Sequence, residues 1–230
     1  VDSYRGKPFS RLEMDEYGDN ILKKLEPLLH PELKVLEIGC ASGISMFRIA
    51  PRVGEYTGTD LSDAIIEVNR ERVTREGHDN IKLFHMAAHE IDSLSGQSYD
   101  LIIINSVIQC FPGHNYLRNV LRQCTNLLSE NGHIFAGDIM DHDLKRDLEK
   151  DLISFKQANP GDHIKTKTDL SAELFVSRGF WSDYGVENNV ITQIEFSNKI
   201  HTVANELTRF RYDVLLQVKK NSPRTHTDLH

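Results

Sequence analysis

The sequence predicts an α/β fold: a doubly wound, mostly parallel sheet of seven strands with an antiparallel C-terminal edge strand and a small helical cap. Short apolar runs alternate with helix-like segments from residue 31 to residue 139, the order that builds parallel strands joined by crossover helices. Residues 99–104 are almost entirely apolar, as expected for a central strand buried on both faces. Two late strand-like runs, 190–196 and 210–218, follow one another and are expected to pair antiparallel at one edge.

The first half of the chain supplies a leading helix and three strands. Apolar positions at helical spacing predict the helix within residues 12–29. Ser62 is the expected N-cap of a charged helix that ends at Gly77. The strands predicted in this half are 34–38, 55–59 and 81–84, and a short helix is expected over 44–50.

The second half begins with the clearest helical pattern of the chain, at residues 114–130. Asn131-Gly132 is its expected left-handed stop, and a strand over 133–139 follows. A charged helix is predicted at 142–157. Another helix, capped by Thr168 or Asp169, is expected to run to about Gly179.

These elements divide the chain into three parts. Residues 1–30 form a helical lead, and residues 31–218 form the main domain, with a cap or insertion at about 142–189. Residues 219–230 read as a disordered tail.

The composition is that of a globular protein, with 39% hydrophobic and 27% charged residues in a chain of 230. The net charge of −7 argues against nucleic acids or anionic membranes as partners. No apolar run is long enough to cross a bilayer, and no secretory signal is recognisable. The three cysteines form no CxxC pair, so neither a zinc ribbon nor a disulfide framework is indicated. We therefore expect a reducing, cytoplasmic setting, and the oligomeric state stays open.

The chain is organised around residues 35–43, an apolar strand that runs into a small-residue loop and then a helix-compatible segment. Such units build nucleotide sites in open parallel sheets. A dinucleotide loop needs G-x-G-x-x-G, whereas this loop offers only Gly39 and Gly43 and is preceded by an acidic residue, Glu37. Asp60 ends the second strand, where a carboxylate can bind the ribose hydroxyls of either ligand class.

The E-x-G-x-x-x-G pattern resembles motif I of class I S-adenosylmethionine-dependent methyltransferases, whose loop wraps an amino-acid tail. Four later blocks resemble methyltransferase domains embedded in nonribosomal peptide synthetases: 99–112 (YDLIIINSVIQCFP), 135–139, 173–176 and 205–214. The resemblance covers about residues 3–218. It implies a Rossmann-like fold, a role in natural product biosynthesis, and S-adenosyl-L-methionine as cofactor.

The resemblance also assigns the cofactor-binding residues. These are Glu37, Gly39, Cys40, Ala41, Gly43, Asp60, Leu61, Ala87, Ala88, Asn105, Ser106 and Gln109. Two departures stand out: Ala41 replaces a common middle glycine, and Ala87-Ala88 stand where relatives often have an acid that contacts the adenine amino group. We therefore expect adenine to be held by main-chain groups and apolar packing.

Methyl transfer to an amine needs alignment and the management of one proton. The preferred base or orienting group is Glu206, with Asn105 and Asp138 shaping the pocket. Glu206 could instead cap a helix or pair with Arg209 or Arg211. Four aromatic residues of the cap are expected to pack over the acceptor pocket: Phe175, Phe180, Trp181 and Tyr184.

The acceptor is expected to be a small natural product or an amino-acid-derived group, free or carrier-bound, with N-methylation favoured and O- or C-methylation open. Two other functions compete: a non-catalytic cofactor-binding module of a larger assembly, and a nicotinamide-dependent oxidoreductase. No metal site is expected, because His85 and His89 have i,i+4 spacing but follow a strand rather than lie on a helix.

Overall fold

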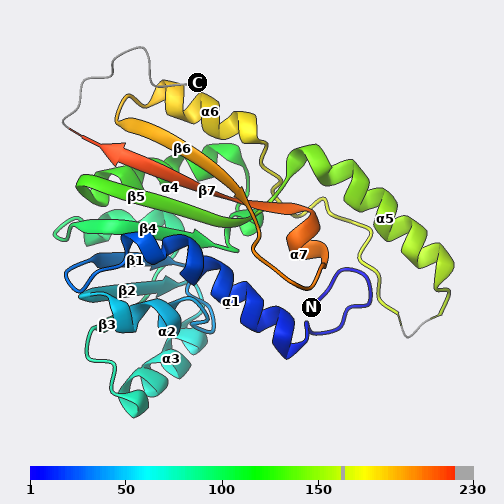
Figure 1. The fold of residues 1–230 in the computed structure, drawn as a ribbon, viewed down its shortest axis with the longest axis horizontal. Coiled ribbons are helices and arrows are strands. Elements are labelled where there is room, and N and C mark those ends of the chain that lie inside the picture. Colours follow the sequence, from blue (N-terminus) through cyan, green and yellow to red (C-terminus); the bar gives the residue numbers. More distant parts are fainter. Residues whose placement is uncertain (162–163, 221–230) are drawn as a thin grey trace.

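The computed structural model describes residues 1–161 and 164–220, and in these residues one mixed sheet carries helices on both faces (Figure 1). The sheet has seven strands in the order β3-β2-β1-β4-β5-β7-β6. Pairings among β1 to β5 are parallel, and β7 is antiparallel to both of its neighbours. The predicted fold class is therefore confirmed. The strands are β1 Lys34–Ile38, β2 Glu55–Asp60, β3 Ile81–His85, β4 Tyr99–Asn105, β5 Leu128–Met140, β6 Ile191–Asn198 and β7 Arg211–Lys219.

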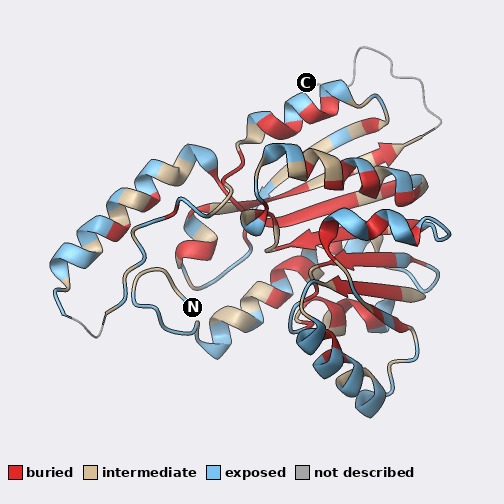
Figure 2. Ribbon diagram, turned by 180° about the vertical axis from the view of Figure 1, so that it is seen from behind, coloured by how far each residue is buried: buried red, intermediate tan, exposed pale blue. Residues whose placement is uncertain are grey.

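Two hydrophobic clusters form the layers on the two faces of the sheet. Alternation along β1 sends Val35 to one cluster and Leu36 to the other, as the two-residue period of a strand requires. One face is covered by α1, α2 and α3, and the other by α4, α6 and the 3-10 helix Ala88–Leu94 (Figures 1 and 2). The α-helices are α1 Arg11–Leu25, α2 Met46–Ile49, α3 Asp63–Glu76, α4 His114–Leu127, α5 Lys145–Ala158, α6 Arg178–Glu187 and α7 Glu206–Arg209.

The predicted caps of α3 are present. The Ser62 hydroxyl accepts a hydrogen bond from the Ile65 amide at 3.4 Å, and Gly77 ends the helix with φ +72°. A third, smaller core lies beneath α5, where Leu148 and Leu152 pack with Met140 and Phe175. Figure 1 shows α5 projecting away from the sheet beside the N-terminal segment.

The predicted stop of the 114–130 helix is wrong. Helix α4 ends at Leu127, and residues 128–130 already belong to β5. Leu128 pairs with Tyr99, and Gly132 pairs with Val218, so strand pairing takes the backbone groups that a longer helix would have used. Close packing requires a glycine at position 132, because a Cβ there would lie 3.1 Å from the Asp100 carbonyl oxygen.

The helix predicted from Thr168 or Asp169 to Gly179 is also wrong. The Asp169 carboxylate accepts a hydrogen bond from the Ser171 amide at 2.9 Å and makes a local turn, which competes with helix capping. Val176 bridges to Asp141 beyond the end of β5. Helix α6 begins only at Arg178, with Ser177 as its N-cap.

The expected aromatic cover over the acceptor pocket is not formed. Trp181 and Tyr184 belong to the main core, where the Trp181 indole donates a hydrogen bond to the Tyr212 hydroxyl at 2.9 Å. Phe175 packs beneath α5 instead. None of the four aromatic residues lines the cavity described below.

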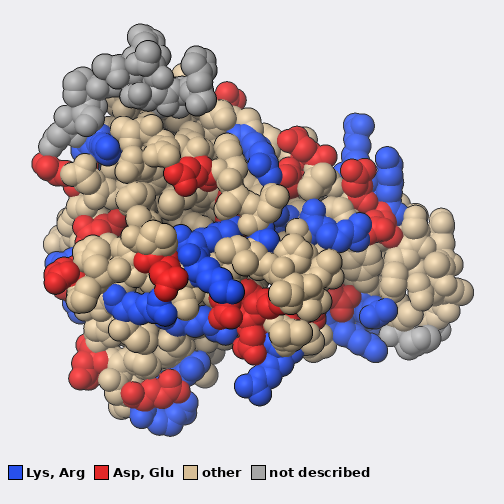
Figure 3. All heavy atoms as spheres, in the orientation of Figure 1, with Lys and Arg blue, Asp and Glu red and all other residues tan. Residues whose placement is uncertain are grey.

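Charged side chains of both signs are interspersed on the face shown in Figure 3. Within the described parts of the chain, no helix has the length and apolarity needed to cross a bilayer. Of the tail predicted to be disordered, residues 221–230 lie outside the described residues.

Candidate active site

A cavity of about 780 Å³ lies at the carboxyl ends of the parallel strands, a volume within the range of small-molecule sites. The loop after β1 and the ends of β2 and β4 line it, and α1 and α7 close it from the side (Figure 1). The cavity brings together Glu206, Asp138 and eleven of the twelve predicted cofactor residues, because all except Gly43 are in its lining.

The loop after β1 depends on left-handed backbone at three positions. Gly39, Ala41 and Gly43 have φ values of +74°, +43° and +77°. A Cβ on Gly39 would meet Val107 at 2.3 Å, and a Cβ on Gly43 would meet the Phe47 ring at 2.5 Å. Gly43 therefore shapes the turn, whereas Ala41 adopts the strained conformation at a cost of about 1 kcal/mol.

Asp60 fixes this loop to the second strand. One of its oxygens accepts a hydrogen bond from the Ala41 amide and the other from the Ser62 amide, both at 2.9 Å. The side-chain amide of Asn69 donates to the Ala41 carbonyl at 2.7 Å. A carboxylate held in this way keeps lone pairs for the hydroxyls of a ribose.

Glu37 is 2% exposed beneath the loop, beside the buried Cys40 thiol. It accepts a hydrogen bond from the Tyr56 hydroxyl at 2.9 Å. Burial raises the pKa of Glu37 to about 8, so the carboxyl carries a proton in the neutral range. Glu37 lines the cavity near the end of β1.

The end of β4 contributes Asn105, Ser106 and Gln109. Asn105 donates to the Tyr17 hydroxyl of α1 at 2.8 Å, and Gln109 donates to the Ser106 carbonyl at 2.9 Å. The side-chain oxygens of Asn105 and Gln109 are buried without a hydrogen-bond partner. Because buried acceptors are normally satisfied, these oxygens fit a ligand that brings N–H or polarised C–H groups, as S-adenosylmethionine does.

Asp138 is sequestered in ion pairs. Its backbone is left-handed, with φ +61°, and its side chain is 1% exposed. Arg211 donates to its carboxylate at 2.5 Å, Ser106 donates at 2.8 Å, and the Lys199 ammonium lies 3.3 Å away. Burial opposes ionisation, but Arg211 and Lys199 outweigh it and lower the pKa of Asp138. Asp138 therefore orients Ser106 and is a poor proton acceptor.

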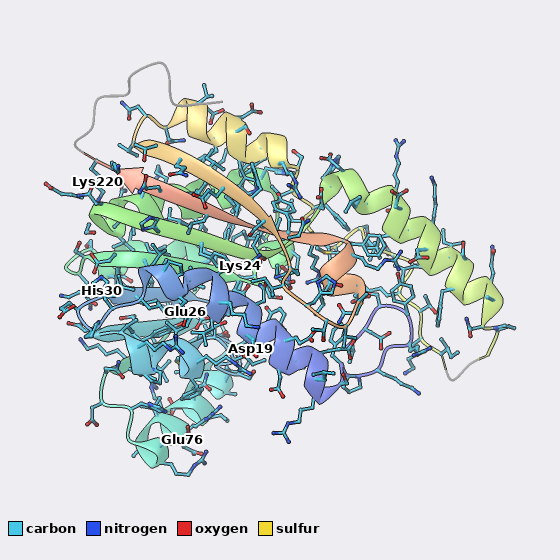
Figure 4. The ribbon with its side chains drawn as sticks, viewed as in Figure 1. Asp19, Lys24, Glu26, His30, Glu76 and Lys220 are labelled. Atoms are coloured by element: carbon cyan, nitrogen blue, oxygen red, sulfur yellow. The ribbon has the colours of Figure 1, made fainter. Side chains whose placement is uncertain are left out.

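A second buried carboxylate, Asp213, supports the first. It accepts a hydrogen bond from the Asp138 amide at 2.7 Å and pairs with Lys199 at 2.7 Å and with Lys24 at 2.5 Å. Figure 4 shows Lys24 on α1, where the helix crosses the sheet. Sequence analysis missed this network, although an aspartate inside the apolar run 210–218 was a signal for it.

Glu206 occupies the first turn of α7 and is 7% exposed. Burial raises its pKa. The Ser3 amide and hydroxyl donate to its two oxygens at 2.9 and 3.2 Å. Two of the three other roles expected for Glu206 are taken by other groups, because Asn205 caps α7 and Arg209 pairs with Asp151 at 3.0 Å. Arg211 lies close enough to stabilise its charge.

An apolar wall completes the cavity on the side of α1 and α7. It consists of Phe9, Met14 and Leu207, beside Tyr17. Glu13 of α1 accepts a hydrogen bond from the side chain of Asn205, the N-cap of α7, at 3.0 Å. This bond holds α1 close to α7. These residues were not predicted, since the leading helix carries no motif that ties it to a strand end.

His85 and His89 make separate contacts. His85 lies 2.9 Å from the Leu61 carbonyl oxygen, and His89 lies 2.9 Å from the Tyr116 hydroxyl. In the residues that the structure describes, no group of three or more His, Cys, Asp or Glu side chains is placed to hold a metal ion.

Comparison with known proteins identifies the family. The family model described as "methyltransferase domain" matches residues 36–134. The chain is 30% identical over 222 residues to the nonribosomal peptide synthetase CymA of Salinispora arenicola, covering 96% of this chain and 3% of that protein. It is also 30% identical over 223 residues to chondramide synthase cmdD of Chondromyces crocatus, covering 94% of this chain and 6% of that protein.

Solved structures share the fold. Magnesium protoporphyrin IX methyltransferase from Synechocystis PCC 6803 with bound SAH has a TM-score of 0.63 at 15% identity, covering 94% of this chain and 90% of that one. N-methyltransferase NodS from Bradyrhizobium japonicum WM9 has a TM-score of 0.64 at 15% identity, covering 92% of this chain and 99% of that one. These structures show the fold, and the methyltransferase-domain match over residues 36–134 places the chain among the S-adenosylmethionine-dependent methyltransferases.

Proposed function

We propose that this chain transfers the methyl group of S-adenosylmethionine to the nitrogen of an amino-acid-derived acceptor, with Glu206 orienting the amine and taking its proton. The observation that carries the proposal is the place of Glu206: a buried carboxylate in the same cavity as the cofactor loop, with a raised pKa. A raised pKa makes a carboxylate a better proton acceptor near neutral pH.

The cofactor supplies an activated methyl group, so the residues of this chain mainly align the two partners. In the proposed step the sulfur–carbon bond breaks as the nitrogen–carbon bond forms, and the nitrogen loses one proton to Glu206. Asn105 and Gln109, with their unpartnered oxygens, hold the donor from the end of β4. Ser106 is held in place by Asp138.

Of the two carboxylates near the acceptor, Glu206 is the better base. Asp138 is already balanced by Arg211 and Lys199, and its lowered pKa opposes protonation. The hydrogen-bond partner of Glu206 is the neutral Ser3, which donates two hydrogen bonds. Because a carboxylate offers about four acceptor positions, an amine can bind beside Ser3.

The acceptor class is supported by the relatives. Two relatives are by name a peptide synthetase and a synthase, and the chain spans only 3% and 6% of their lengths. We therefore propose an amino-acid-derived acceptor, either free or attached to a carrier. The apolar wall of Phe9, Met14 and Leu207 suits an acceptor with an apolar side chain.

Substitution Glu206→Gln tests the assignment. We expect kcat for methyl transfer to an amine to fall by about 100-fold or more, since general-base groups contribute at least that much. Affinity for S-adenosylmethionine, measured by calorimetry, should be unchanged.

The matched control is Glu55→Gln, which alters a carboxylate at the start of β2 that pairs with Lys82 at 3.2 Å and does not line the cavity. Its turnover should stay within about twofold of the unmodified chain. Equal turnover in Glu206→Gln and Glu55→Gln would remove Glu206 from the mechanism.

A further inference from the structure

The order of the strand ends locates the nucleobase end of the cavity. In the proposed function, the loop after β1 would receive the amino-acid tail of the cofactor and Asp60 at the end of β2 would bind the ribose. The next strand in the same direction is β3, followed by Ala87 and Ala88. A cofactor bound in this order extends its adenine toward the residues after β3.

Polar side chains are scarce at this end. Of the cavity-lining residues that directly follow β2 and β3, Leu61, Met86, Ala87 and Ala88 are apolar and His89 is polar; Tyr116 of α4 also lines the cavity. Adenine carries an exocyclic amino group that donates hydrogen bonds, and burying it without an acceptor would cost affinity. Neither alanine side chain offers an acceptor. Glu90 does not line the cavity, and its carboxylate accepts the Ala87 amide hydrogen bond at 2.9 Å.

The side chains of His89 and Tyr116 contact each other in the lining of this part of the cavity. His89 Nδ1 lies 2.9 Å from the Tyr116 hydroxyl oxygen, and the rings are 5.6 Å apart. Phe111 packs edge-on against Tyr116 at 4.8 Å. The buried Gln123 of α4 donates to the His89 carbonyl at 2.9 Å. Both partners are thus held to α4, and the pair is preorganised.

We propose that the His89–Tyr116 pair recognises the exocyclic amino group of adenine, in the role that an acidic side chain at 87–88 would otherwise take. In neutral His89 with an unprotonated Nδ1, that nitrogen accepts the Tyr116 hydroxyl hydrogen. The phenolic oxygen then keeps a lone pair for an N–H of the base. Orientation by the imidazole makes this oxygen a directed acceptor rather than a rotating hydroxyl.

Substitution Tyr116→Phe tests the proposal with two ligands: S-adenosylhomocysteine and its 6-deamino analogue, which carries purine in place of adenine. Calorimetry should show about tenfold weaker binding of S-adenosylhomocysteine, equivalent to one lost hydrogen bond. Binding of the 6-deamino analogue should change by less than about twofold, because the lost acceptor has no partner there.

The matched control is Tyr99→Phe. The Tyr99 hydroxyl bonds to Gln97 at 2.8 Å and does not line the cavity, so both ligands should bind as before. His89→Ala, which leaves Tyr116 undirected, is a second variant and should weaken S-adenosylhomocysteine selectively too. Equal weakening of the two ligands, or no weakening, in the folded variants would overturn the proposal. Methyl-transfer activity does not enter this test, so its outcome is independent of the role of Glu206.

Discussion

Asp138 and Glu206 are carboxylates on the same cavity, yet their pKa values are shifted in opposite directions. Arg211 and Lys199 outweigh the burial of Asp138, whereas burial dominates for Glu206. From the sequence, Glu206 is the preferred base or orienting group and Asp138 is expected to shape the pocket. The lowered pKa of Asp138 depends on Arg211 and Lys199, which lie far from Asp138 along the chain.

Glu37 gives a prediction about pH. Burial raises its pKa from 4.5 to about 8, so the folded chain binds a proton that the unfolded chain releases. The resulting stability is present below about pH 4.5 and is lost as pH rises toward 8. The free energy of unfolding should therefore fall relative to that of Glu37→Gln between these pH values. Urea unfolding of both proteins measures the difference, and parallel pH curves would contradict it.

At the scale of elements, local signals predicted both ends of α3 but not the end of α4 or the start of α6. Ser62 and Gly77 delimit α3 as expected, because capping depends on neighbouring residues only. Helix α4 ended early because Leu128 pairs with Tyr99 on β4, a contact that no local pattern reveals. For the same reason the segment before α6 was misread: Val176 bridges to Asp141 instead of entering a helix.

The ion-pair network joins α1, β5 and β7, and Lys199 is its centre. The Lys199 side chain is 4% exposed and lies between Asp138 and Asp213. Substitution Lys199→Met should lower the free energy of unfolding by about 3 kcal/mol, because it removes one of the two cations that pair with each of the buried carboxylates Asp138 and Asp213. Denaturant titration measures this loss.

The matched control for the network is Lys150→Met, which breaks an exposed ion pair with Asp147 on α5. Exposed pairs contribute little, so its unfolding free energy should change by less than about 0.5 kcal/mol. Equal stability of Lys199→Met and Lys150→Met would show that the buried network is not stabilising.

Acid should weaken the same network. Lys199 and Lys24 overcome the burial of Asp213 and lower its pKa to about 2, below its usual value of 3.8. This contribution is complete above the unfolded value and is lost as pH falls from about 4 toward 2. The stability difference between the unmodified chain and Lys199→Met should narrow over that interval.

At the scale of the whole molecule, the cavity joins segments from both ends of the chain. Figure 1 shows α1 and α7 meeting beside the strand ends, although they lie at opposite ends of the sequence. That Glu37, Gly39 and Asp60 line one cavity was predictable, because they belong to one strand–loop–strand motif. Phe9 and Met14 were not predicted there, since they reach the cavity through tertiary packing alone.

The central claim is that the acceptor atom is nitrogen and that Glu206 manages its proton. The most direct measurement uses S-adenosylmethionine labelled with ¹³C in the methyl group, a panel of aminoacyl thioesters, and NMR of the methylated products. We expect a new methyl resonance in the range of carbon bonded to nitrogen, formed by the unmodified chain and nearly absent with Glu206→Gln. A methyl group bonded to oxygen or carbon, or an undiminished product with Glu206→Gln, would contradict it.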